Sequence, residues 1–297
     1  MWLKAWLLEI RAPFLLLPVT LSFVGSSLAI YEGHFDSFRF LLFTAVLVLF
    51  HVSVNTLNEY YDYKTGIDQN TTRTMFSGGS GMLQAGLLKP KKVLQVALIC
   101  FVAGAALSAY VLYVVGVILL PIIILGMIFV AFYTQLFARI MLGEIVAGLG
   151  LGFLPVLGAY MIQTSSVSPE SILLSILAGI LTFNLLFLNE FPDLDADAKG
   201  GRKNLVMALG TRESASLYSG LTLSVYVVIC LGILAAIFPL STAIGLLTVP
   251  LAFKASRMSR RNPKILDGFV PALKANVQII LITQALIAVG YLVATAV

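Results

Sequence analysis

Long apolar runs are the feature that most constrains the fold of this 297-residue chain. A bilayer core about 30 Å thick is crossed by a helix of roughly 20 apolar residues, and runs of that length recur from one end of the sequence to the other. Only 11% of the residues are charged, against about 25% in soluble domains. The chain therefore cannot cover a globular surface with charges, and we expect an all-α, polytopic membrane protein.

Nine runs are apolar and long enough to be read as transmembrane helices. We expect them to surround a central cavity within a single domain, residues 1–297. The run that ends beyond Pro250 and Lys254 is the weakest of the nine. The expected spans are 12–31, 38–58, 93–115, 117–137, 142–163, 170–190, 214–237, 239–255 and 275–296.

The basic residues test this arrangement independently. If all nine runs cross the membrane, every one of the 19 Lys and Arg residues except Arg39 falls on the same side. The positive-inside rule assigns that side to the cytoplasm. We therefore expect a cell-membrane protein with a cytoplasmic N-terminus, an external C-terminus and a site that opens to the cytoplasm. The net charge of +5 favours contact with anionic lipids and anionic substrates over nucleic acid.

Two polar segments on the expected cytoplasmic side repeat one five-residue pattern. N-E-x-x-D occurs at 58–62, after the second run, and at 189–193, after the sixth. A further aspartate follows each copy, so the motif regions extend over about 55–73 and 189–203. We interpret the two copies as a diverged internal duplication, because repeated halves of membrane proteins commonly face each other across a shared site.

The spacing within each copy favours a metal site. Asn58 and Asp62 are four residues apart and share a helix face, and Asn189 and Asp193 repeat that spacing. Carboxylates at a membrane boundary are costly unless they face a cavity or a partner. Oxygen-rich sites of this kind suit Mg²⁺, which takes one or two carboxylates together with phosphate oxygens and water. The predicted metal ligands are Asp62, Asp68, Asp193 and Asp197.

Basic residues lie close to the same aspartates. Arg73 follows the first set, and Lys199, Arg202 and Lys203 follow the second. Carboxylates beside Arg and Lys indicate a metal together with a phosphate group. The Ser-Gly run at 77–81 either brings backbone N–H groups to an anion or forms an ordinary flexible turn.

Other polar residues nearby are not assigned to the site. Asp195 is two residues from each neighbouring aspartate, so on a helix it points elsewhere and is expected to be solvated. Pro192 is expected to kink or restart the helix in the second motif. His34 and His51 have no metal-ligating partner in the sequence and are not selected.

The two motifs, their places after the second and sixth runs and the nine runs themselves resemble the UbiA superfamily of intramembrane prenyltransferases. The resemblance covers nearly the whole chain. In that family the first motif reads approximately N-D-x-x-D with a downstream aspartate, matched here by Asn58, Asp62 and Asp68. The second reads approximately D-x-x-x-D, matched by Asp193 and Asp197.

Further family positions are matched outside these motifs. Tyr133 and Thr134 match a Tyr-Thr pair that ends the fourth helix, and Arg139 matches a basic residue that follows it. Arg11 matches an arginine ahead of the first helix. Two positions depart from the pattern: Glu59 stands where many members have aspartate, and the proline after the Tyr-Thr pair is absent.

The resemblance implies a Mg²⁺-dependent transfer of a prenyl group from a polyprenyl diphosphate, through an allylic carbocation, to a small aromatic acceptor. The spacing from Asp62 to Asp68 resembles the menaquinone branch, which prenylates dihydroxynaphthoate in quinone biosynthesis. The implied catalytic residues are Asp62, Asp68, Asp193, Asp197 and Tyr133. The implied diphosphate-binding residues are Asn58, Arg73, Arg139, Asn189, Lys199, Lys203 and Arg11.

Three alternatives belong beside this interpretation. The acceptor could be non-aromatic, such as a glycerol phosphate lipid precursor. A secondary transporter also combines repeats with intramembrane acids, but its acids cluster near the bilayer midplane, whereas these lie at one face. A lipid phosphotransferase acting on CDP-activated substrates also uses aspartates and Mg²⁺, but its D-G-x-x-A-R pattern is absent.

Overall fold

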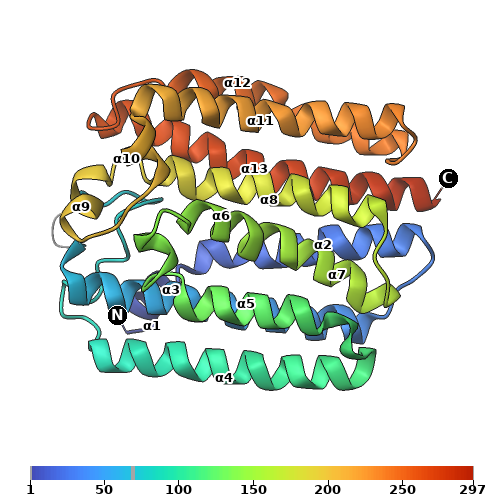
Figure 1. Ribbon diagram of the computed structural model, residues 1–297, viewed down its shortest axis with the longest axis horizontal. Helices are drawn as coiled ribbons and strands as arrows, with labels where there is room; N and C mark the ends of the chain where they lie inside the picture. Colours follow the sequence, from blue (N-terminus) through green and yellow to red (C-terminus); the bar gives the residue numbers. More distant parts are fainter. Residues whose placement is uncertain (1, 68–70, 297) are drawn as a thin grey trace.

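The computed structural model describes residues 2–67 and 71–296. All regular structure in these ranges is helical, which confirms the all-α prediction. The long helices lie side by side along the longest axis of the molecule, and α1 (Trp2–Glu9) lies toward the opposite end from the close of α13 (Leu266–Ala296) (Figure 1).

Within the described residues, seven helical segments are long and apolar enough to cross a membrane. Two of them are composite: the first joins η1 to α2, and the fourth joins α6, the π-helical turn η5 and α7. The segments are η1 (Ala12–Leu15) with α2 (Leu16–Tyr31), α3 (Ser37–Thr65), α4 (Pro90–Val115), α6 (Gly143–Gly148) with η5 (Leu149–Phe153) and α7 (Leu154–Thr164), α8 (Pro169–Asn189), α11 (Thr211–Leu234) and α13.

The other two predicted spans are different in kind, so the count of nine is not confirmed. The expected helix at 117–137 is the shorter apolar segment Val117–Phe132, formed by η3 (Val117–Leu119) and α5 (Leu120–Phe132). The expected helix at 239–255 is a 3₁₀ helix, η6 (Leu240–Thr248), followed by α12 (Val249–Met258). Because a 3₁₀ helix rises about 2.0 Å per residue and an α-helix about 1.5 Å, this pair still extends for roughly 33 Å.

Two helices are longer than their apolar runs predicted. The second span was expected to end at 58, but α3 continues to Thr65 and ends at Gly66, whose positive φ of 76° is the usual left-handed helix stop. The last span was expected to begin at 275, but α13 begins at Leu266 and includes Pro271. In both cases polar residues extend the helix beyond the apolar run, so the first N-E-x-x-D motif lies inside a helix.

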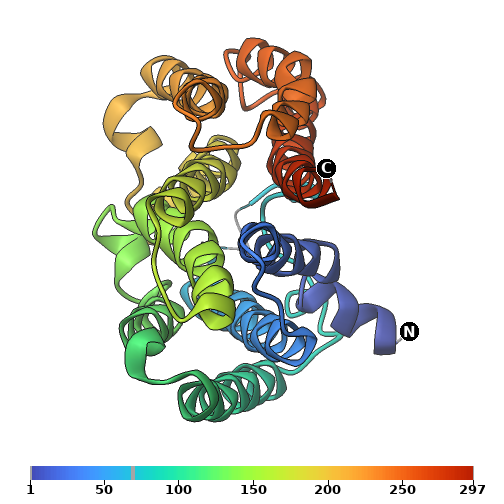
Figure 2. The same ribbon diagram turned by 90° about the vertical axis from the view of Figure 1, so that its right-hand side faces the viewer.

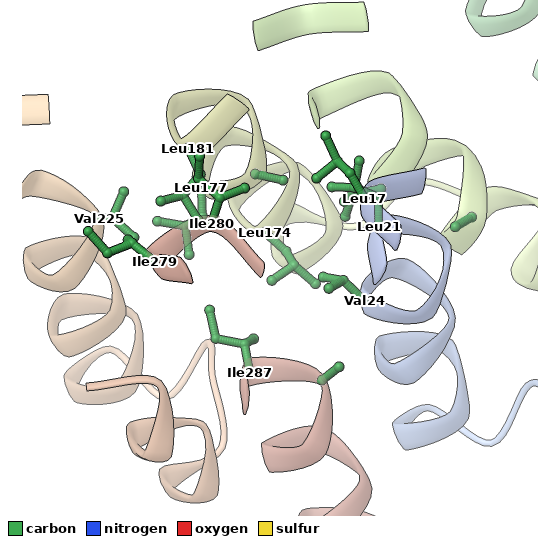
Figure 3. Close-up of a cluster of buried hydrophobic side chains, with 14 of the residues drawn as sticks. Leu17, Leu21, Val24, Leu174, Leu177, Leu181, Val225, Ile279, Ile280 and Ile287 are labelled. Atoms are coloured by element: carbon green, nitrogen blue, oxygen red, sulfur yellow. The ribbon is translucent and has the colours of Figure 1, made fainter. Parts of the chain in front are cut away.

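The largest apolar core lies where α2, α8, α11 and α13 meet (Figure 3). Leu17 and Leu21 on α2 and Leu177 and Leu181 on α8 are almost fully buried. Seen end-on, the helices form a ring in which α4 lies at one edge and α11 and α12 lie at the opposite edge (Figure 2). This core fixes α8, which carries the second motif at its end.

A second close contact holds α8 against η5. A Cβ added to Gly152 would come within 2.1 Å of Thr182 Oγ1 and 2.5 Å of Ala178 O. Thr182 Oγ1 donates a hydrogen bond to Gly148 O at 3.3 Å across the two helices. Only glycine permits this approach, and it brings α6 and η5 close to the end of α8.

Candidate active site

A cavity of about 180 Å³ is lined by both sequence motifs. The short helices α9 (Leu194–Lys199) and α10 (Leu205–Leu209) lie together at the end of the bundle where α8 stops (Figure 1). The cavity wall is polar near these elements. It is apolar deeper in the bundle, where Leu17, Phe129, Leu151 and Leu185 line it.

One polar stripe along α3 forms a wall of the cavity. His51, Asn55, Asn58 and Asp62 all line it, and their spacings of four, three and four residues place them on one helix face. Asn58 Nδ2 donates to Thr134 Oγ1 at 3.3 Å, which ties this stripe to the segment after α5. The uninterrupted helix therefore holds the first motif in a fixed row.

The second motif reaches the same cavity through a helix end. The helix α8 stops at Asn189, and α9 begins at Leu194. In the turn, Asp193 N donates to Glu190 O at 3.2 Å, and Asp197 N then donates to Asp193 O at 2.9 Å. Asn189, Glu190, Asp193 and Asp197 all line the cavity.

Arg202 joins the two motifs. Its Nη2 donates to both carboxylate oxygens of Asp62 at 2.6 Å, and its Nη1 donates to Asp197 Oδ1 at 3.4 Å. Asn204 Nδ2 donates to the other oxygen of Asp197 at 3.3 Å. Burial raises the pKa of Asp197, and the Arg202 guanidinium opposes that rise. One cation thus lies between carboxylates that are 140 and five residues away in the sequence.

A pair of carboxyl groups lies beside these residues. Glu144 is fully buried, and its Oε1 accepts a hydrogen bond from Leu205 N. The carboxyl group of Glu190 lies close enough to Glu144 for the two charges to interact. Burial raises the pKa of Glu190 well above its ordinary value, and the charge of Glu144 raises it further. Glu190 therefore holds its proton to a higher pH than an ordinary glutamate.

The oxygen-rich wall fits a magnesium ion that is completed by a phosphate ligand. No three His, Cys, Asp or Glu side chains cluster as a ready metal site within residues 2–67 and 71–296. Mg²⁺, however, needs only one or two carboxylates when phosphate oxygens and water supply the rest. Asn189 Oδ1 and Glu190 Oε2 are buried in this wall without a hydrogen-bond partner, as oxygens that await a ligand would be.

The family follows from comparison with known proteins. The model of the UbiA prenyltransferase family matches residues 16–276. The chain belongs to the UbiA prenyltransferase family. Its similarity to that family was expected from the two motifs, and the match confirms it.

Two curated UbiA-family relatives extend this result. The 1,4-dihydroxy-2-naphthoate octaprenyltransferase of Escherichia coli K12 is 28% identical over 295 residues, which cover 97% of this chain and 94% of that protein. The protein of the same name from Bacillus subtilis 168 is 32% identical over 206 residues. That match covers 67% of this chain and 65% of the Bacillus protein.

Solved structures support the UbiA fold. A UbiA homologue from Aeropyrum pernix K1 superposes with a TM-score of 0.72 at 15% identity, covering 95% of this chain and 98% of that one. A UbiA homologue from Archaeoglobus fulgidus, bound to GPP and Mg²⁺, superposes with a TM-score of 0.65 at 15% identity. That superposition covers 99% of this chain and 100% of the other.

The predicted site residues of this UbiA-family chain separate into three groups. Asp68 lies outside the described residues. The exposed residues that do not line the cavity are Arg73, Arg139, Lys199 and Lys203. The residues that line the cavity are Arg11, Asn58, Asp62, Tyr133, Asn189, Asp193 and Asp197.

The basic residues differ most from expectation. Lys199 ends α9 two positions after Asp197, so it lies on another face of that helix. Lys203 is exposed, while its backbone N–H donates to Ala138 O at 3.1 Å. Arg73 lies along the Ser-Gly loop, where a Cβ on Gly81 would come within 2.9 Å of its Nε. Among the basic residues that follow the two motifs, Arg202 is the one that lines the cavity, where Arg11 also lies.

Sequence reasoning missed several residues of the cavity wall. His51 was set aside because it has no metal partner, but it lies one turn from Asn55 on the polar stripe. Glu190, at the second position of a repeated motif, also lines the wall. Glu144, an acid within an apolar run, does not line it but is buried and accepts from Leu205 N. An acid or imidazole inside a membrane span marks a functional site by default, and that signal identifies His51 and Glu144.

Proposed function

We propose that this protein transfers a prenyl group from a polyprenyl diphosphate to a small aromatic acceptor, as a step of quinone biosynthesis. The observation that carries the proposal is one cavity with a carboxylate-rich end and an apolar interior, because a prenyl diphosphate is likewise charged at one end and apolar along its length. The dihydroxynaphthoate prenyltransferases among its relatives support the aromatic acceptor.

The charged end is proposed to bind the diphosphate with Mg²⁺. Asp62, Asp193 and Asp197 are the proposed ligands in the cavity wall, together with Asp68, and a bound Mg²⁺ would neutralise the leaving diphosphate. Arg202 lies between two of these carboxylates and is proposed to donate to the diphosphate oxygens. Amides on Asn58 and Asn189 complete a donor and acceptor set for the same group.

The reaction separates charge inside this cavity. The bond between the prenyl carbon and the diphosphate oxygen breaks with both electrons on oxygen, which leaves an allylic cation. A carbon of the electron-rich acceptor ring then bonds to the cation and loses its proton to the released diphosphate. Apolar residues such as Leu151 and Leu185 exclude water that would otherwise capture the cation. The ring of Tyr133 lines the cavity, and its face can stabilise positive charge.

Two apolar pockets adjoin the cavity, and each is proposed to hold one of the two substrates. The pocket between α2, α8 and α13 is lined entirely by apolar residues, of which Phe14, Leu17, Phe76 and Leu185 also line the cavity. It suits an isoprenoid chain. The pocket between α2, α3, α5 and α7 shares His51, Gly126, Val130, Gly150 and Leu151 with the cavity, and His51 is the polar side chain among them. It suits a hydroxylated ring, with His51 binding a ring oxygen.

The orientation in the membrane forms part of the proposal. Nearly all Lys and Arg residues belong to connections on one side of the predicted spans, and the positive-inside rule makes that side cytoplasmic. The N-terminus is then cytoplasmic and the C-terminus is external. The carboxylate end of the cavity faces the cytoplasm, where Mg²⁺ and the diphosphate group of the donor reach it from water.

The first prediction tests metal and function together. Purified protein with Mg²⁺, a radiolabelled prenyl diphosphate and dihydroxynaphthoate should form a labelled lipid-soluble product. EDTA should abolish this transfer and excess Mg²⁺ should restore it, because hard oxygen ligands dominate the site. Glycerol phosphate, supplied instead of the aromatic acceptor, should give no product.

A variant that separates the two substrates in this assay is His51→Phe, which keeps an aromatic ring without the imidazole nitrogens. It should raise KM for the acceptor and leave KM for the prenyl diphosphate unchanged. Transfer that persists in EDTA would exclude the metal-bound diphosphate. Transfer to glycerol phosphate but not to any aromatic acceptor would exclude the proposed acceptor class.

A further inference from the structure

Glu59 has the same place in the first motif that Glu190 has in the second, but it does not line the cavity. Its side chain is only 1% exposed. Its Oε1 accepts hydrogen bonds from Arg11 Nε at 3.0 Å and Arg11 Nη2 at 2.7 Å. Both carboxylate oxygens also accept from Ser80 N, at 3.0 and 2.9 Å. These donors occupy the carboxylate, which therefore turns away from a metal ion in the cavity.

The first partner of Glu59 belongs to a strained turn. Arg11 joins α1 to η1 with φ 53° and ψ 51°, a left-handed conformation that residues other than glycine seldom adopt. Asn55 Nδ2 donates to Ile10 O at 3.3 Å in the same turn. Asn55 and Glu59 are one helical turn apart on α3. Two side chains of the first motif thus hold the backbone and the guanidinium of a turn that lines the cavity.

The second partner belongs to the Ser-Gly loop. Ser80 Oγ donates to Oε2 of the fully buried Glu9 at 2.6 Å, while Ser80 N donates to Glu59. The same loop supplies Ser77, Gly78 and Gly79 to the cavity wall. Glu59 therefore binds the Arg11 turn and this loop directly, and the loop binds the end of α1 through Glu9.

We propose that Glu59 is a positioning residue, which holds Arg11 and the loop of residues 77–81 against the cavity so that both contact the diphosphate of the donor. The proposal rests on the proposed function, since it assigns these groups to the donor substrate. It separates the two glutamates of the repeated motif: Glu59 acts through Arg11 and the loop, and Glu190 lies in the cavity itself.

The kinetic consequence is specific. In Glu59→Gln the neutral amide replaces the charged carboxylate and has one acceptor oxygen in place of two. It cannot keep all the hydrogen bonds from Arg11 and Ser80 N, so Arg11 and the loop are no longer held in position. KM for the prenyl diphosphate should rise about tenfold, the effect of losing one charge-assisted hydrogen bond. The Mg²⁺ concentration for half-maximal rate, measured at saturating donor, should stay at the wild-type value because Glu59 is not a ligand.

A double-mutant cycle with Arg11→Gln tests whether Glu59 acts through Arg11. The double variant Glu59→Gln, Arg11→Gln should raise KM no more than about twofold beyond Arg11→Gln, because residues in one network are not additive. Ser80→Ala keeps the backbone donor to Glu59 and should change KM less than Glu59→Gln does. If Glu59→Gln does not fold, Glu59→Asp, which keeps the charge but shortens its reach, gives the same comparison.

Three results would overturn the proposal. They are an unchanged KM for the donor in a folded Glu59→Gln protein, a shifted Mg²⁺ dependence at saturating donor, and additive effects of the Glu59 and Arg11 substitutions. Wild-type turnover is the separate test of the proposed function. If wild type forms no prenylated product, the function fails, whereas an active wild type with an equally active Glu59→Gln variant rejects only this role for Glu59.

Discussion

The two copies of N-E-x-x-D have the same sequence pattern but different backbone conformations. The first copy lies within α3, which continues without a break to Thr65. The second copy straddles a helix end, because α8 stops at Asn189 and α9 starts at Leu194. The glutamate of the first copy, Glu59, does not line the cavity, whereas that of the second copy, Glu190, does.

Helix geometry explains this difference. Adjacent residues on an α-helix point about 100° apart, so Glu59 cannot share the face of Asn58 and instead meets Arg11 and Ser80. In the second copy Glu190 still has helical dihedral angles and donates its N–H to Leu186 O. The helix α8 ends there, however, and both Asn189 and Glu190 line the cavity at this helix end. Both copies of the motif therefore place their final aspartate, Asp62 or Asp193, in the cavity wall. The position of the glutamate depends on the local backbone.

The largest expected effect tests what the two copies share. If both hold Mg²⁺ on one diphosphate, Asp62→Ala and Asp193→Ala should each reduce prenyl transfer on the order of a hundredfold or more, and the double variant should be scarcely worse, since residues that act as a unit are non-additive. Prenyl transfer and prenyl-diphosphate binding should be measured for all three. Near wild-type activity in Asp193→Ala would confine the chemistry to the first copy.

The next effect tests what separates the copies. Pro192 has no N–H and would clash with a continued α8, so Pro192→Ala should let the helix extend and turn Asp193 away from the cavity. Transfer should fall roughly 10- to 100-fold, the cost of misplacing a catalytic group by about an ångström. The matched control is Pro271→Ala inside α13, which should keep wild-type activity. Equal activities in both variants would show that Pro192 does not shape the motif.

A smaller effect follows from the raised pKa of Glu190. Because its pKa is higher in the folded than in the unfolded state, its contribution to stability is greatest below the unfolded pKa and is lost as pH rises through the folded pKa. Glu190→Gln should therefore raise the melting temperature relative to wild type as pH increases from about 5 to 8. The exposed Glu213→Gln is the control. A difference that grows toward acid pH would contradict the assignment.

The smallest effect is expected at Asp195, between the two aspartates of the second copy. Its carboxylate is exposed and accepts from Lys264 Nζ at 2.8 Å. That hydrogen bond lowers the pKa of Asp195, so any stability that it adds is present at neutral pH and is lost as pH falls through that pKa. Asp195→Asn should keep wild-type transfer and melting temperature at physiological salt. A large loss of activity would place Asp195 in the site.

The sequence by itself determined the class of protein and the region of the site. Apolar runs of about 20 residues require a membrane. Five helices in the structure match their predicted runs to within three residues at each end, and two more contain their runs but extend beyond them. Carboxylates repeated at equivalent helix ends indicated one shared site, and Asp62, Asp193 and Asp197 do line one cavity. These inferences need only helix length, helix period and the cost of charge in a membrane.

Tertiary structure alone decided which charged residues face the cavity. Three basic residues follow Asp197 within six positions: Lys199, Arg202 and Lys203. The sequence does not distinguish them, yet Arg202 is the one that bonds to Asp62. After a helix break, the direction of each side chain depends on contacts with distant segments. Here a Cβ on Gly200 would come within 1.8 Å of Ile67, and the backbone of residue 203 bonds to that of residue 138. Such contacts lie 65 to 133 residues apart in the chain, and no local pattern encodes them.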